Sequence, residues 1–170
     1  MTLSNDDILY SFDNDSIIIE PFEQNQLQGA SYDFRVGKQG ATTSIKKLVD
    51  IEKEGHLLLK PDDFAIVIIF EKLVLDAQHI GRFSLKSQYA RQGLITSAGL
   101  IDPGYDGRLV IGVANHAHRS LSLPYKDNFI TVEFQKLEKA STKPYSGPYQ
   151  KKYELGQQDI QNIIKELKIT

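Results

Sequence analysis

The chain has 170 residues, 41% of them hydrophobic and 25% charged, which is typical of one soluble globular domain over 1–170. Its net charge of −2 gives no general attraction to nucleic acids or anionic membranes, and its lack of cysteine excludes disulfides and thiolate zinc sites. No stretch approaches the roughly 20 apolar residues that span a bilayer, and MTLSNDDILY lacks the features of a secretion signal, so we expect a cytoplasmic protein without a membrane or nucleic-acid partner.

The first half of the chain is predicted to form one short helix followed by strands. Ser4 and the aspartates close behind it are typical of a helix start, and the helix is expected to run through about Phe12. Strands are predicted over 16–22, where a proline ends the strand, and over 29–37. Residues 56–75 hold two β-rich runs on either side of a Pro-Asp-Asp turn, and each run is expected to form a strand.

The second half is predicted to add two strands and a closing helix. GRLVIGVAN (107–115) and NFITVEFQKL (128–137) are typical of strands. Many short strands separated by turns favour a mainly β fold, a barrel or a sandwich. A C-terminal helix is expected over 159–168, because apolar residues recur there at helical spacing, namely Ile160, Ile163, Ile164 and Leu167.

His116 and His118 have a spacing that suits a metal site, because alternate residues of a strand share one face. They follow Asn115 at a predicted strand end with no carboxylate nearby. A solvated turn is therefore the preferred interpretation, and no metal site made of protein ligands is expected.

Two other segments carry groups that suit an anionic ligand. RFSLKSQYARQGL (82–94) combines cations with serine hydroxyls, which fit a triphosphate, and a solvated helix turn is the alternative. PYSGPYQKKYELGQQ (144–158) combines rings, lysines and amides, as expected of an active-site lid that is mobile until a ligand binds. A linker that only leads to the C-terminal helix is the alternative for this second segment.

AGLIDPGYDGRLVIGVAN (98–115) resembles the third motif of the trimeric dUTPase and dCTP deaminase superfamily, with an Ile-Asp-x-x-Tyr-x-Gly core and an Asn thirteen residues after the Asp. LSNDDI, IEPFEQNQLQGASYDFRVG and KSQYARQGL resemble N-terminal blocks of the dCTP deaminase branch. The segment 144–158 resembles that branch's C-terminal block, in which Tyr145, Lys152 and Gln157 match, with one extra residue before Gln157.

This resemblance implies a fold, an assembly and a ligand. The fold is a distorted β-barrel of the dUTPase-like, β-clip type, with short N- and C-terminal helices. The assembly is a homotrimer whose sites lie between subunits and hold a deoxynucleoside triphosphate, dUTP or dCTP. Mg²⁺ is expected to bind through the substrate phosphates rather than through a set of protein ligands.

The resemblance also implies roles for single residues. Asp102 would contact the sugar 3′-hydroxyl and orient the attacking water, and Tyr105 would pack its ring under the deoxyribose. The alternative is that both residues only form a turn. The other residues implied to bind substrate are Lys86, Ser87 and Arg91 at the phosphates, Thr96 and Ala98 in the hairpin that reads the base, and Tyr145, Lys152 and Gln157 in the lid.

Gly112 is the main departure from the deaminase pattern. Deaminases of this superfamily carry a glutamate ten residues after the motif aspartate, where it activates water for attack on cytosine C4. Here that position is Gly112, and 108–115 contains no carboxylate. General acid–base help is typically worth about 10²–10⁴-fold, so efficient deamination by this route is not expected.

The dUTPase pattern is also incomplete. DNFITVEF contains no glutamine to match the phosphate-binding glutamine that dUTPases carry near the position of Thr131, and their glycine-rich, arginine-bearing tail is missing. We predict a Mg²⁺-dependent dUTP diphosphatase that converts dUTP and water to dUMP and diphosphate. The alternatives are a dCTP deaminase with a displaced base and a catalytically weak nucleotide-binding or regulatory trimer.

Overall fold

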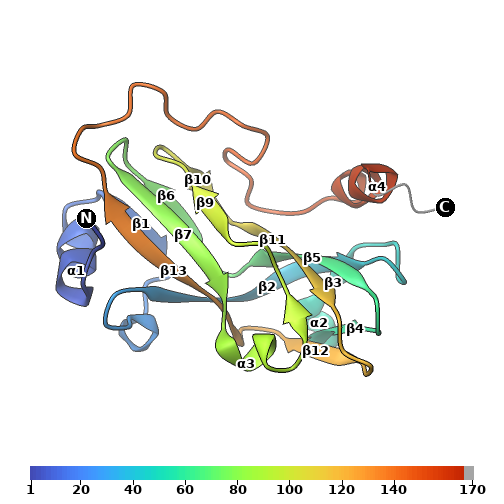
Figure 1. Ribbon diagram of the computed structural model, residues 1–170. Coiled ribbons are helices and arrows are strands. Elements are labelled where there is room, and N and C mark those ends of the chain that lie inside the picture. Colours follow the sequence, from blue (N-terminus) through green and yellow to red (C-terminus); the bar gives the residue numbers. More distant parts are fainter. Residues whose placement is uncertain (167–170) are drawn as a thin grey trace.

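The computed structural model describes residues 1–166, and Figure 1 shows a curled set of strands with short helices at its edges. The last residues of the predicted C-terminal helix, 167 and 168, lie outside the described residues. In chain order the elements are α1 (Asn5–Asp13), β1 (Ile17–Glu20), the 3₁₀ helix η1 (Gln24–Gln26), β2 (Tyr32–Thr42), β3 (Val49–Asp50), α2 (Ile51–Glu54), β4 (His56–Leu59), β5 (Phe64–Ile69), β6 (Lys72–Leu75), β7 (His79–Leu85), α3 (Ser87–Ala90), β8 (Leu94–Ile95), β9 (Gly99–Ile101), β10 (Asp106–Gly107), β11 (Val110–Asn115), β12 (Leu121–Pro124), β13 (Asn128–Lys136) and α4 (Gln157–Glu166).

Within residues 1–166 the strands form three antiparallel sheets. The largest has the order β8-β11-β5-β2-β13-β7-β9, with β3 paired to β2 off this path. The second has the order β1-β6-β10, and β12 pairs with β4 in the third. The predicted mainly β, barrel-like class is confirmed.

Local sequence signals explain where the first elements begin and end. The Ser4 side chain accepts a hydrogen bond from the Asp7 N–H at 3.3 Å, and the Asp7 carboxylate accepts one from the Ser4 N–H at 2.9 Å. This capping box starts α1 at the predicted place. Strand β1 ends at Glu20, directly before Pro21, which has no N–H to donate to a neighbouring strand.

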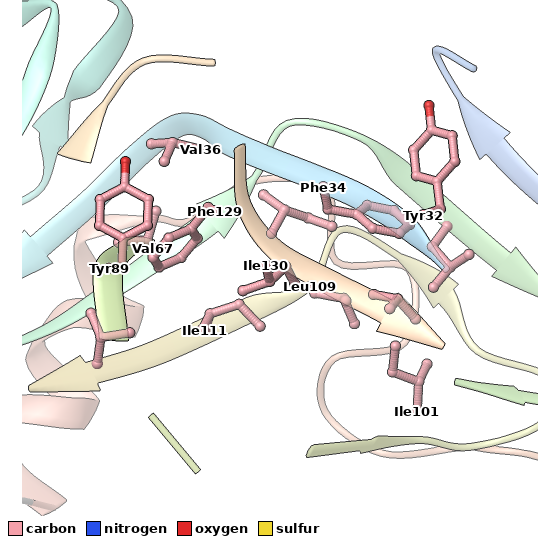
Figure 2. Close-up of a cluster of buried hydrophobic side chains, with 14 of the residues drawn as sticks. Tyr32, Phe34, Val36, Val67, Tyr89, Ile101, Leu109, Ile111, Phe129 and Ile130 are labelled. Carbon is pink, nitrogen blue, oxygen red and sulfur yellow. The ribbon is translucent and has the colours of Figure 1, made fainter. Parts of the chain in front are cut away.

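The main core fills the inside of the curl (Figure 2). Tyr32 and Phe34 of β2, and Phe129 of β13, have no exposed surface, and Ile111 of β11 is nearly as buried. Alternation along each strand sends these side chains inward. The labelled side chains in Figure 2 come from segments far apart in the sequence, among them β2, β5, α3 and β13, so the core depends on long-range contacts.

A second apolar cluster lies on the outside of the sheet, under α4. Ile160 of α4 packs there with Ile66 and Ile68 of β5 and with Leu155. The residues that alternate with them in β5, namely Ala65, Val67 and Ile69, face the main core. Both faces of β5 are therefore covered, which explains its uninterrupted apolar sequence.

The prediction of one strand after the Pro-Asp-Asp turn is wrong, because that run forms β5 and β6 with a turn at Phe70 and Glu71. Glu71 is fully buried and accepts hydrogen bonds from the Arg35 N–H at 2.9 Å and the Arg35 Nε at 2.6 Å. This ion pair draws the chain inward at a place without glycine, asparagine or proline. The predicted strand 107–115 likewise divides into β10 and β11.

Candidate functional site

The loop between β9 and β10 carries Asp102 and Tyr105, and it is hydrogen-bonded to the end of β6 and to Asp76. The Leu75 N–H donates to the Tyr105 carbonyl at 2.8 Å, and the Gly104 N–H donates to the Asp76 carbonyl at 3.0 Å. Gly104 has φ +78, a left-handed conformation that glycine adopts without strain. The Pro-Gly turn after Asp102 is thus held in one position against β6.

Asp76 in turn is fixed by its neighbours. His79 Nδ1 lies 2.8 Å from Asp76 Oδ1, and the same oxygen accepts from the Gln78 N–H at 2.8 Å. Burial alone would raise the pKa of the Asp76 carboxyl, but the hydrogen bonds from His79 and Gln78 outweigh it and lower that pKa. The residue whose carbonyl accepts from the Gly104 N–H is therefore itself held in place through its ionised, hydrogen-bonded side chain.

A cavity of about 140 Å³ opens beside this loop. Asp102 is exposed at the cavity, whereas Tyr105 is only 5% exposed. Burial raises the pKa of the Tyr105 phenol well above its usual value, so its hydroxyl stays protonated. A carboxylate beside apolar and aromatic walls suits a ring or a sugar with polar substituents. The remaining lining residues are Phe83, Leu100, Ile101, Leu109, Val110, Tyr145 and Tyr149.

The C-terminal tail forms one wall of this cavity. In Figure 1 the tail arches from β13 across the β9–β10 end of the molecule before it reaches α4. The Tyr145 N–H donates to the Pro103 carbonyl at 2.8 Å, and the Tyr145 ring lies 5.6 Å from the Tyr105 ring. The tail thus packs on the loop of its own chain, and its mobility without a ligand stays a prediction.

Lys152 and Gln157, two residues predicted to bind substrate, hold the tail and α4 in this structure. Lys152 Nζ donates to the Asp159 carboxylate, and the Gln157 side chain accepts from the Leu48 N–H at 3.0 Å. Lys152 lines a neighbouring cavity of about 170 Å³, next to Tyr149. Contact of either side chain with a ligand remains a prediction.

The basic cluster of Lys86, Ser87 and Arg91 lies at the other end of β7, around α3. Gly81 of β7 pairs with Ile101, next to Asp102, whereas the strand ends at Leu85, roughly 13 Å away at about 3.3 Å per residue. Figure 1 shows α3 and the β9–β10 loop at opposite ends of the molecule. One chain does not bring the predicted phosphate residues to Asp102.

Asp33 belongs to this basic cluster, although the sequence analysis did not select it. Lys86 Nζ donates to Asp33 Oδ2 at 2.6 Å. Asp33 is 2% exposed, and its Oδ1 has no hydrogen-bond partner within residues 1–166. The sequence signal that marked Asp33 was its place between two aromatic residues, Tyr32 and Phe34, which the structure shows to have no exposed surface.

Thr96 and Gly112 meet on the side of β11 that pairs with β8. Thr96 Oγ1 donates to the Gly112 carbonyl at 2.6 Å, while Ala98 is exposed in the connection between β8 and β9, which do not pair with each other as the expected hairpin would. A Cβ at Gly112 would lie 2.8 Å from Cζ of Phe64. The Phe64 ring thus occupies the space into which a side chain at 112 would extend.

Metal ligands and the histidine pair give no further candidate site. No group of three or more His, Asp or Glu side chains that could hold a metal ion occurs in the described part of the chain.

Asn115 is 1% exposed and its Nδ2 donates to the carbonyls of Leu59, Lys60 and Arg119. Asn115 therefore has a structural role. None of the helices within residues 1–166 is long and apolar enough to cross a membrane.

Comparison with known proteins identifies the family. Residues 2–137 match the family model described as dCTP deaminase-like. The chain belongs to the dCTP deaminase-like family. The chain is 37% identical to a dCTP deaminase of Thermococcus sibiricus over 134 residues, which cover 79% of this chain and 85% of the relative. It is 27% identical to a dUMP-forming dCTP deaminase of Pseudarthrobacter chlorophenolicus, covering 91% of this chain and 90% of the relative.

The fold of this chain is similar to that of solved deaminase and dUTPase structures. A deaminase of 2′-deoxycytidine 5′-triphosphate from Agrobacterium tumefaciens matches with a TM-score of 0.67 and 19% identity, over 81% of this chain and 49% of that longer chain. A mutant dUTPase of phage phi11 of S. aureus, described with a structural Mg(II) ion, matches with a TM-score of 0.54 and 13% identity, over 77% of this chain and 97% of that one. The superfamily resemblance is confirmed: the sequence shows the dCTP deaminase-like family, and a solved deaminase and solved dUTPases share the fold.

Proposed function

We propose that the protein hydrolyses dUTP to dUMP and diphosphate. One observation carries the choice between the two reactions of the superfamily. Asp102 stands at the cavity beside Tyr105, whereas position 112 is a glycine whose side-chain space holds the Phe64 ring. A carboxylate is thus available to orient water near a bound sugar, and none is available on β11 to activate water at a base.

The reaction needs water to attack the α-phosphorus while diphosphate leaves. Asp102 accepts a hydrogen bond from that water and takes its proton, which is the work of a general base. Tyr105 packs under the deoxyribose and leaves no space for a 2′-hydroxyl. The tail, with Tyr145, closes the cavity and excludes other water from it.

The phosphates require the basic cluster, which lies at the far end of β7 in the same chain. A complete site therefore needs Lys86, Ser87 and Arg91 from one copy and Asp102 from another, and the homotrimer expected from the resemblance supplies both. Such a site holds the triphosphate by charge and hydroxyl donors. Positioning of this kind accounts for much of the acceleration in phosphoryl transfer.

Magnesium fits this site as a partner of the substrate phosphates. The described residues hold no cluster of three ligands, but Asp33 offers a buried carboxylate oxygen without a hydrogen-bond partner beside Lys86. Asp33, through that oxygen, and the phosphates themselves would hold the ion. When bound, it neutralises charge on the leaving diphosphate.

A dCTP deaminase is the second candidate, because the relatives with 37% and 27% identity carry that name. One of them is dUMP-forming, which couples deamination to release of diphosphate. For this chain, deamination would require a carboxylate from outside β11 to take the place of the missing glutamate.

The deciding experiment supplies dUTP and dCTP separately with Mg²⁺ and measures diphosphate and ammonia from each. We expect diphosphate from dUTP and little or no ammonia from dCTP. A parallel reaction with EDTA tests the magnesium requirement. Ammonia release from dCTP at a rate comparable with dUTP turnover would establish the second candidate instead.

A further inference from the structure

Gln150 makes a two-point contact with the loop that carries Tyr105. Its Nε2 donates to the Gly104 carbonyl at 2.8 Å, and its Oε1 accepts from the Asp106 N–H at 3.0 Å. The two backbone groups flank Tyr105 on either side. One side-chain amide therefore pairs with the loop as a neighbouring peptide group in a sheet would.

The surrounding contacts leave Gln150 little freedom. Its own N–H donates to the Gly147 carbonyl at 3.1 Å, and the next N–H along the chain, that of Lys151, donates to the Asp106 carbonyl at 2.6 Å. On the opposite side, the Leu75 N–H holds the Tyr105 carbonyl at 2.8 Å. The backbone of Tyr105 is thus held from β6 on one side and from Gln150 on the other.

We infer that Gln150 is a positioning residue that fixes Tyr105 and, through it, the sugar-binding wall of the cavity. This inference rests on the proposed function, in which Tyr105 discriminates against a 2′-hydroxyl. The contact needs one donor and one acceptor, which an amide supplies. A glutamate has the same shape but, when ionised, only accepts, so it would repel the Gly104 carbonyl.

The test compares Gln150→Glu and Gln150→Ala with the wild-type protein. Gln161→Glu is the matched control, because it makes the same change of charge at an exposed position of α4. The first measurement is the ratio of kcat/KM for dUTP to kcat/KM for UTP. We expect this ratio to fall by about tenfold or more in both Gln150 variants, because Gln150→Glu loses one of the two hydrogen bonds and Gln150→Ala loses both, and to stay constant in the control.

The second measurement is hydrogen exchange of the Asp106 amide without nucleotide. Faster exchange at Asp106, with unchanged exchange at the core residue Val132, shows that only the loop has loosened. A dUTP/UTP ratio within about twofold of the wild type in an active variant would overturn the inference. So would unchanged exchange at Asp106.

The two measurements, turnover and hydrogen exchange, distinguish a failure of this inference from a failure of the proposed function. If the wild-type protein turns over neither nucleotide, the proposed function fails. The exchange measurement then decides the structural claim alone: faster exchange in both Gln150 variants supports it, and unchanged exchange rejects it.

Discussion

Replacing Gly112 with glutamate should not convert this protein into an efficient deaminase. A Cβ at this position would lie 2.8 Å from Cζ and 3.2 Å from Cε2 of Phe64, whereas carbon atoms in ordinary contact lie about 3.5–4.0 Å apart. The ring must therefore move, and it lies against Ile160 and Ile163 of α4 in a shared apolar groove. The substitution thus disturbs the attachment of α4 as well as β11.

The expected cost follows from three terms. Overpacking of this kind costs about 1–3 kcal/mol, and removal of glycine from a strand returns about 0.5–1 kcal/mol. A carboxylate without a partner on the apolar face beside Ile66 adds about 1–3 kcal/mol. We expect Gly112→Glu to lower the free energy of unfolding by about 3 kcal/mol, and Gly112→Ala, which lacks the carboxylate, by about 1 kcal/mol.

Equilibrium unfolding in urea, at one protein concentration for all variants, measures these values. A cycle with Phe64→Ala and the double variant Phe64→Ala/Gly112→Glu isolates the clash, and we expect a favourable coupling of about 1–3 kcal/mol. Zero coupling, or a Gly112→Glu variant within about 0.5 kcal/mol of the wild type, would refute the reasoning. Rapid ammonia release from dCTP by the single variant would do the same.

Four further predictions concern the site and its support. Asp102→Asn should lower kcat for dUTP by about 10²–10⁴-fold and change KM by no more than about threefold, measured by diphosphate release; near-normal kcat would point to another base. Truncation after Lys143 should abolish turnover while the assembly, followed by light scattering, survives; full activity would show that the tail is not needed. Glu71→Gln should destabilise the fold by about 3–5 kcal/mol, as expected for a broken buried ion pair, whereas the exposed Glu52→Gln should cost less than about 1 kcal/mol in the same urea assay. Because the pKa of Asp76 is lowered in the folded protein, its contribution to stability is present above the ordinary carboxyl pKa of about 3.9 and is lost as the pH falls through the lower folded value; urea unfolding of the wild type and Asp76→Asn should therefore converge in acid.

Local patterns in the sequence predicted the elements that depend on local interactions. The Ser4 capping box joins residues three apart, and the apolar spacing around Ile160 reflects one face of α4. The motif around Asp102 also stands in one continuous stretch, so the cavity-forming loop could be found before the structure.

The features that were not predicted depend on pairs far apart in the sequence. Asp33 meets Lys86 across 53 residues, and Gln150 meets Gly104 across 46. The turn at Glu71 exists because of an ion pair with Arg35 across 36 residues. No periodicity or turn signal marks such partners, because the fold itself brings them together.

The long sequence separation between the Tyr105 loop and Gln150 also has a consequence for biosynthesis. Asp106 is made 44 residues before Gln150, the residue whose side chain accepts its N–H. At a synthesis rate of about 5–20 residues per second, Gln150 is added to the chain roughly 2–9 s after Asp106. A nascent chain can thus pair much of its sheet, yet the loop with Asp102 and Tyr105 takes its final form only after the C-terminal tail emerges. The final shape of the Tyr105 loop is in this way tied to synthesis of the segment that carries Gln150.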